Sequence, residues 1–102
     1  GYPPFSRIIN VYLKHRDDNV LTEVSVRYSN LLRQTFGHRV FGPEAPMVSR
    51  IQNLYIRQVM LKMENAVSMT KVKKILRNLY EQMVTLDSRM KSTILYYDVD
   101  PV

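Results

Sequence analysis

The first third of the chain changes from a strand-like to a helix-like pattern of apolar residues. Apolar and polar side chains alternate between residues 7 and 15, and one face of this strand would carry Ile9, Val11 and Leu13. Asp17-Asp18-Asn19 then offers side-chain acceptors that suit a helix N-cap. Apolar residues recur at helical spacing up to Phe36, and Gly37 suits a helix end. These patterns predict a strand followed by a helix.

The middle of the chain predicts two further strands. An irregular strand begins at residues 40–43, where Gly42-Pro43 favours a bulge or bend, and it continues through Met47, Val48 and Ile51. Gln52-Asn53 fits a tight turn, although it lacks the glycine that hairpin turns prefer. Residues 54–63 are nearly all apolar on one side, which is typical of a central strand.

A second helix and a last strand complete the pattern. Ser68 or Thr70 would cap a helix whose apolar stripe contains Val72, Ile75, Leu76, Leu79, Met83 and Leu86. Residues 93–97 predict a short strand. The element order β-α-β-β-α-β predicts an α+β split βαβ sandwich of the ferredoxin-like or ribosomal S10-like kind. In such a fold two helices cover one face of a four-stranded sheet.

The length of 102 residues corresponds to one domain. The chain opens without an initiator Met, and two adjacent prolines there are typical of a linker. We therefore interpret residues 1–5 as a linker or cloning remnant and residues 6–102 as the domain. In this interpretation the chain is a module of a longer protein.

Composition narrows the classes of function. The chain has no cysteine, which excludes disulfides and cysteine-based zinc sites, and no apolar run approaches the ~20 residues of a membrane span. It carries 15 Lys and Arg against 9 Asp and Glu, a formal net charge of +6. A polyanion is therefore the expected partner, with nucleic acid ahead of a membrane surface.

Motifs for enzymatic chemistry are not found. Three glycines cannot build a glycine-rich phosphate loop. We interpret His15 and His38 as solvated surface residues, because neither has the spacing of a base that activates a nucleophile. Asp98 and Asp100 would lie on one side of an extended segment, where two carboxylates could hold Mg²⁺. We favour the simpler interpretation that they pair with Lys or Arg, or cap backbone N–H groups.

The second predicted helix carries a concentration of basic residues. Lys71, Lys73, Lys74 and Arg77 fall within two turns and are opposed only by Glu81. A bound polyanion would relieve the repulsion among these cations, and each neutralised phosphate would steepen the salt dependence of binding. The alternative is an ordinary solvated helix face.

Cations and tyrosines also share faces of the predicted strands. Further phosphate contacts are expected from strand and turn cations, among them Arg50, Arg57 and Lys62. Tyr12 shares a face with Lys14, and Tyr55 shares a face with Arg57. If both pairs face solvent together, their rings could stack bases while the cations hold phosphates. The alternative is half-buried packing with a solvated hydroxyl group.

Several segments, in order along essentially the whole chain, resemble the C-terminal domain of PriA, the primosomal replication-restart DNA helicase (primosomal protein N′). Pro3-Pro4-Phe5-Ser6 resembles that family's entry to its first strand, and 41–46 (Phe-Gly-Pro-Glu-Ala-Pro) resembles its Leu-Gly-Pro segment, with Ser-Arg-Ile following at 49–51. Residues 55–62 resemble its Tyr-Arg-x-Gln strand, and 98–101 match its Asp-Val-Asp-Pro ending.

The chain departs from the family pattern in its central strand. Ile56 stands where the family has Arg after the Tyr, and Arg57 stands at the next position, which is commonly aromatic. Gln52-Asn53-Leu54 replaces a glycine-rich turn. These differences concern the side of the strand that would present a cation to DNA, and they leave the predicted architecture intact.

The resemblance implies a role in replication restart. PriA is an ATP-dependent 3′-to-5′ helicase that recognises abandoned forks and D-loops, and its C-terminal S10-like domain contributes binding to single-stranded and branched DNA. Its implied partners are the helicase core of the same chain, the single-strand-binding protein and other primosome proteins, in the bacterial cytoplasm at the nucleoid. No cofactor is implied for this domain, because ATP, Mg²⁺ and zinc belong to other parts of that helicase.

Three other interpretations remain. The chain could be a structural or protein-interaction module that docks on the helicase core or captures the acidic, aromatic-ended tail of the single-strand-binding protein. It could be a separate RNA-binding or ribosomal S10-like protein, which the opening prolines and the Asp-Val-Asp-Pro ending make less favourable. An enzyme within these residues is the least favourable.

Overall fold

The computed structural model describes residues 6–64 and 66–100, and it begins with the predicted strand, β1 (Ser6–His15). The predicted helix follows as α1 (Asp18–Phe36). Its N-cap is Asp17, whose carboxylate accepts hydrogen bonds from the backbone N–H groups of Asn19 at 2.9 Å and Val20 at 3.2 Å. Gly37 ends the helix with a φ of 64°, a conformation that favours glycine, and a short 3-10 turn, η1 (Gly37–Arg39), follows.

The irregular strand divides into two elements, which differs from the single strand that the sequence predicts. β2 (Val40–Glu44) and β3 (Arg50–Ile51) pair with the same neighbouring strand, so the sheet has five strands rather than four. The pairing of β2 shifts register between Phe41 and Glu44, which confirms the bulge expected at Gly42-Pro43. Pro46 lies in the break between the two elements and has no N–H group to donate across the sheet.

A tight hairpin leads into the longest strand, β4 (Leu54–Glu64). Gln52 and Asn53 have φ values of 51° and 66°, which is the left-handed pair that a two-residue type I′ turn requires. β4 is central, as predicted, because it pairs with β1 on one side and with β2 and β3 on the other.

The second helix, α2 (Met69–Leu86), begins at Ser68, whose hydroxyl accepts from the backbone N–H of Lys71 at 3.4 Å. A 3-10 turn, η2 (Ser88–Ser92), connects it to the last strand, β5 (Ile94–Val99). Neither helix of the described residues is long and apolar enough to cross a membrane.

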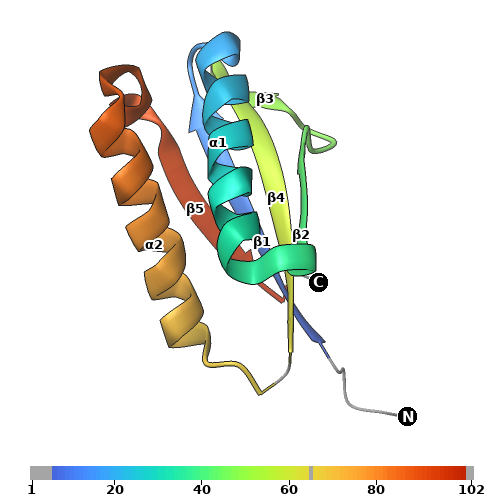
Figure 1. Ribbon diagram of the computed structural model, residues 1–102. Coiled ribbons are helices and arrows are strands. Elements are labelled where there is room, and N and C mark those ends of the chain that lie inside the picture. Colours follow the sequence, from blue (N-terminus) through green and yellow to red (C-terminus); the bar gives the residue numbers. More distant parts are fainter. Residues whose placement is uncertain (1–5, 65, 101–102) are drawn as a thin grey trace.

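The five strands of the described residues form one antiparallel sheet in the order β2-β4-β1-β5, and β3 also pairs with β4. Figure 1 shows both helices packed on the same side of this sheet, which confirms the α+β sandwich. The other side, which no helix covers, is called the open face below. Along β1 the side chains of Ile9, Val11 and Leu13 point to the helices and are completely buried.

A tyrosine joins the two helices within the core. Tyr28 of α1 is completely buried, and its hydroxyl donates to the backbone carbonyl of Leu76 in α2 at 2.8 Å. Its ring meets that of Tyr80 edge to face, with centroids 6.4 Å apart. Burial raises the pKa of Tyr28, so its hydroxyl stays protonated and remains a donor.

Candidate nucleic-acid interface

Helix α2 presents its basic residues to solvent. Its apolar stripe, which includes Val72 and Leu76, is buried against the sheet and α1, and this leaves the charged side of the helix outward. Lys71, Lys73 and Lys74, here called the α2 lysines, are exposed and form no ion pair within residues 6–64 and 66–100. These three ammonium groups are therefore available to an external anion.

Arg77 follows the α2 lysines on the same helix but already has partners. Its guanidinium lies 3.8 Å from the Glu81 carboxylate and 5.6 Å from the centre of the Tyr80 ring. The pair with Glu81 is on the surface, where such pairs contribute at most about 1 kcal/mol. Arg77 can therefore exchange Glu81 for a phosphate at a small cost, but it is less available than the lysines.

The three cations predicted on the strands, Arg50, Arg57 and Lys62, differ in their contacts and exposure. Arg57 donates to the carboxylate of Asp18 at 2.6 Å, and its side chain is only 20% exposed. Arg50 stacks over the ring of Tyr55, with the guanidinium carbon 5.0 Å from the ring centroid. Lys62 is exposed on the open face. Of these three predicted phosphate contacts, Lys62 has no ion-pair partner among residues 6–64 and 66–100, Arg50 stays exposed, and Arg57 is engaged with α1.

The two predicted tyrosine–cation pairs do not share a surface. In the β1–β4 register, Arg57 lies opposite the core residue Leu13, and Tyr55 lies opposite His15, so this pair is on the helix-covered side. Tyr12 and Lys14 occupy the alternate positions of β1 and lie on the open face. A joint surface of both pairs, as the sequence suggested, is therefore excluded by the alternation of side chains along the strands.

The open face supplies a different aromatic pair. Tyr12 lies directly opposite Tyr96 of β5, and their rings stack with centroids 4.8 Å apart and planes 16° apart. The ammonium group of Lys14 lies 4.8 Å from the centre of the Tyr96 ring. Tyr96 was missed as a candidate because the β1–β5 register, which joins it to Tyr12, is a long-range feature.

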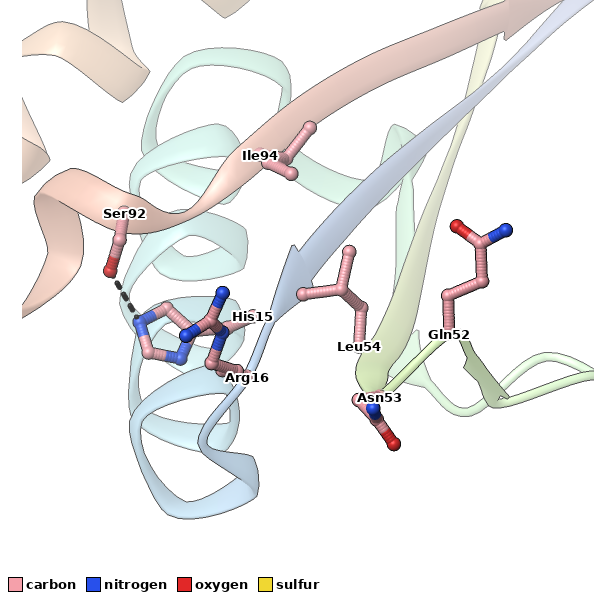
Figure 2. A pocket seen from close by; sticks show the side chains of 7 residues that line it. All are labelled: His15, Arg16, Gln52, Asn53, Leu54, Ser92 and Ile94. Carbon is pink, nitrogen blue, oxygen red and sulfur yellow. Dashed lines mark hydrogen bonds between the residues drawn. The ribbon is translucent and has the colours of Figure 1, made fainter.

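His15 is buried, with 6% of its surface exposed, which corrects the expectation of a solvated histidine. It borders a cavity of about 880 Å³ at the end of the sheet, and Figure 2 shows its ring directed at Ser92. Nδ1 accepts from the Asp17 backbone N–H at 2.8 Å, and Nε2 lies 3.2 Å from the Arg89 carbonyl and 3.0 Å from Ser92 Oγ. Both ring nitrogens are used structurally. His38 is exposed, as expected.

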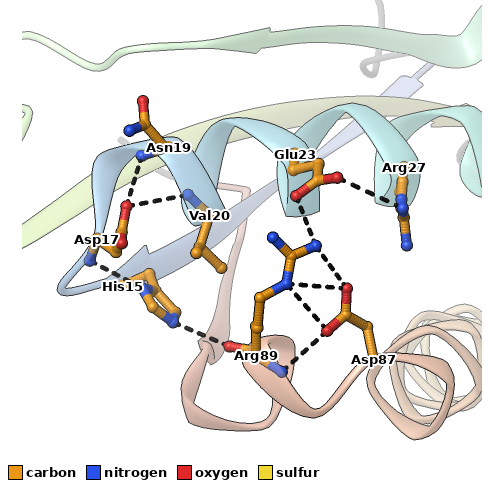
Figure 3. Close-up of polar contacts among 8 residues, drawn as sticks. All are labelled: His15, Asp17, Asn19, Val20, Glu23, Arg27, Asp87 and Arg89. Carbon is orange, nitrogen blue, oxygen red and sulfur yellow. Dashed lines mark hydrogen bonds and ion pairs between the residues drawn. The ribbon is translucent and has the colours of Figure 1, made fainter.

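Many of the remaining arginines form ion pairs with carboxylates of the same chain. In Figure 3 the Arg89 guanidinium lies between two carboxylates, at 2.7 Å from Asp87 and 2.9 Å from Glu23, and Glu23 also meets Arg27. The hydrogen bonds from Arg89 lower the pKa of Asp87 to about 2. The network joins η2 to α1, so its role is to hold elements together.

The carboxylate of Asp100, one of the two C-terminal aspartates, is engaged by Arg7 and by the backbone. Asp100 accepts hydrogen bonds from the Arg7 side chain at 2.8 and 2.9 Å and from the Ile8 backbone N–H at 3.1 Å. The Arg7 guanidinium is the main reason why the pKa of Asp100 is lowered. Residues 6–64 and 66–100 contain no group of three or more side chains suited to hold a metal. The favoured interpretation, pairing and capping, is confirmed for Asp100.

Comparisons with known proteins support the fold and identify the family. The chain matches no curated protein sequence. Among solved structures it is similar to a protein described as "De novo designed protein Foldit4", with a TM-score of 0.63 and 7% identity over 95% of this chain and 98% of that one, which concerns the fold alone. The family model described as the primosomal protein N C-terminal domain matches residues 1–102. The chain therefore belongs to the primosomal protein N C-terminal domain family.

Proposed function

We propose that this chain is a DNA-binding accessory domain of the replication-restart helicase PriA and that it helps the helicase bind single-stranded and branched DNA. The observation that carries the proposal is the exposure of the α2 lysines, which have no carboxylate partner in the described residues. Among the described residues, in contrast, six arginines form internal ion pairs: Arg7, Arg27, Arg39, Arg57, Arg77 and Arg89.

Unpaired lysines on a helix surface suit recognition of the phosphate backbone. Phosphate contacts position DNA without reading its sequence, and a protein that acts at any fork needs this property. Each lysine that meets a phosphate releases condensed counterions, so binding weakens steeply as salt rises. In this proposal ATP hydrolysis with its Mg²⁺, and zinc binding, belong to other parts of the helicase.

The α2 lysines can be tested by replacement with glutamine. We expect the triple variant Lys71→Gln, Lys73→Gln and Lys74→Gln to bind a labelled fork DNA about tenfold or more weakly than the unaltered chain. We also expect the slope of log affinity against log salt to flatten by about 2 to 3, because up to three phosphate contacts are lost. Fluorescence anisotropy over a salt series measures both quantities.

A matched control removes the same charge from other surfaces. Arg16→Gln, Arg27→Gln and Lys91→Gln also lower the net charge by three, and all three side chains are exposed. We expect this variant to bind nearly as well as the unaltered chain. Equal losses in the two triple variants would show that net charge, rather than the α2 surface, drives binding, and an affinity that does not change with salt would contradict the electrostatic mechanism altogether.

A protein-interaction module is the second candidate, and exposed apolar side chains favour it. Leu86, at the end of α2, is 85% exposed, and it borders a groove of about 270 Å³ between the two helices, with Leu31 and Met83. Such a groove could dock against the helicase core, or it could bind the tail of the single-strand-binding protein. Titration of the chain with an acidic, aromatic-ended peptide and with fork DNA separates the two candidates.

A further inference from the structure

The stacked pair Tyr12 and Tyr96 lies on the open face, between β1 and the edge strand β5. Tyr96 is 39% exposed and Tyr12 is half-buried, so the stacked pair is partly open to solvent. Desolvation raises the pKa of the Tyr96 hydroxyl, which remains protonated at neutral pH. The pair is a rigid aromatic platform, because adjacent strands hold both rings in register.

A shallow groove of about 500 Å³ runs beside this platform. Tyr12, Tyr96 and Ile56 line it from the sheet, and Met47, Val48 and Ile51 line it from the segment between β2 and β4. Met47 and Val48 are largely exposed, at 103% and 58%. The groove therefore has an aromatic floor and one apolar wall, and neither α1 nor α2 covers it.

The charged side chains on this face indicate which molecules with flat rings could bind to the platform. Lys14 holds its ammonium group 4.8 Å from the Tyr96 ring, and Lys62 is exposed on the same face. Asp98 borders the groove and can accept a hydrogen bond from the amino group of a base. An anionic chain that carries flat rings satisfies both the aromatic floor and the lysines.

We infer that the open face binds single-stranded DNA, with an unpaired base stacked against Tyr96 and the neighbouring phosphate held by Lys14. Only unpaired bases expose a ring face to an external platform, since those of a duplex are stacked on one another. Stacking tolerates any base, so this surface would not depend on sequence. The inference rests on the proposed function and adds a second DNA-binding surface, on the opposite side of the sheet from the α2 lysines.

The test compares two variants on two probes. We expect Tyr96→Ala to weaken binding of an oligothymidylate of about 20 nucleotides by about 5- to 100-fold, and Tyr96→Phe, which keeps the ring, to stay within about twofold of the unaltered chain. An abasic oligonucleotide of the same length keeps the phosphates but has no ring to stack. Its affinity should be the same for all three proteins in anisotropy titrations.

A second measurement needs no variant and does not depend on how the alanine variant folds. The unaltered chain is photo-crosslinked to an oligothymidylate that carries 5-iododeoxyuridine, and the attached peptides are identified by mass spectrometry. Crosslinks to Tyr12 or Tyr96 support the inference. Crosslinks found only on α2 peptides overturn it.

The outcomes separate this inference from the proposed function. If the α2 lysine variant loses fork binding while Tyr96→Ala binds oligothymidylate normally, the proposed function stands and the open face is not a base platform. A loss that is equal on the oligothymidylate and the abasic probe also overturns the inference, because stacking is then not responsible. If the unaltered chain binds no DNA of either kind, both proposals fail together.

Discussion

Gly42 shows how one residue determines the course of β2. Its φ is 106°, a region that side chains other than glycine rarely adopt. A Cβ atom placed there would lie 2.9 Å from the backbone carbonyl oxygen of Gln58 in β4. The side chain of Arg33 donates to the Gly42 carbonyl from the neighbouring helix, so the bulge is held from both sides. A residue with no side chain allows this close approach of two strands.

We expect Gly42→Ala to destabilise the protein more than Gly37→Ala. Both positions have positive φ, and backbone strain of this kind costs about 1–3 kcal/mol. At Gly37 nothing lies within 4 Å of the added Cβ, whereas at Gly42 the new atom also meets backbone that cannot turn aside. Urea denaturation of the two variants measures the difference in the free energy of unfolding. Equal losses would show that the contact with Gln58 is relieved by a small shift of the strand.

At the scale of elements, local signals set where helices begin and long-range packing decides which way a strand faces. The start of α1 follows from Asp17, whose side chain satisfies two helix N–H groups that have no partner within the helix. β4 behaves differently, because both of its faces carry apolar residues: Ile56 and Met60 on one face, Val59 and Leu61 on the other. Its pattern alone does not show which face the helices cover.

We expect Asp17→Ala to lower the free energy of unfolding by about 1 kcal/mol, the usual cost of losing an N-cap side chain. Asn19→Ala is the matched control, because Asn19 is exposed in the first turn of the same helix and gives only its backbone N–H to the cap. That variant should be as stable as the unaltered chain, since alanine favours a helix. Thermal or urea denaturation distinguishes the two, and equal losses would show that the cap contributes no stability of its own.

In the molecule as a whole, the charged groups that hold elements together differ from those that are open to a ligand. Arginine–carboxylate pairs join elements that are distant in sequence, such as Arg7 with Asp100 and Arg89 with Glu23. The α2 lysines lie on the outer surface of the helix layer, and Lys14 and Lys62 lie on the open face of the sheet. A branched DNA could therefore meet cations on both sides of one small domain.

The paired carboxylates predict a loss of stability in acid. The pKa of Asp87 falls from 3.8 to about 2 in the folded protein, and the pKa of Asp100 is also lowered. The unfolded chain thus binds more protons in this range, so the free energy of unfolding decreases as pH falls from about 4 towards 2. Urea denaturation between about pH 2 and pH 6 measures this decrease.

The arginine partners supply the control for that measurement. We expect Arg7→Gln with Arg89→Gln to reduce the acid-dependent loss, because these guanidinium groups are the largest cause of the two lowered pKa values, with backbone N–H groups second. Arg16→Gln removes an exposed cation that forms no ion pair in the described residues, and it should leave the pH profile unchanged. A profile that is the same in all three proteins would assign the acid sensitivity to other groups.

The fold class and most of the elements, apart from the division into β2 and β3, could be predicted from the sequence, because caps, turns and periodic apolar residues act over a few neighbouring positions. Asp17 and Ser68 begin the helices and Gly37 ends the first one, as predicted. The second helix, which is basic, presents its lysines to solvent. Three features became visible in the folded structure alone: Tyr12 stacks on Tyr96, Tyr55 and Arg57 lie on the helix side, and His15 is buried. Those outcomes depend on strand register and on the face that the helices cover, and both are set by contacts between residues far apart in the chain.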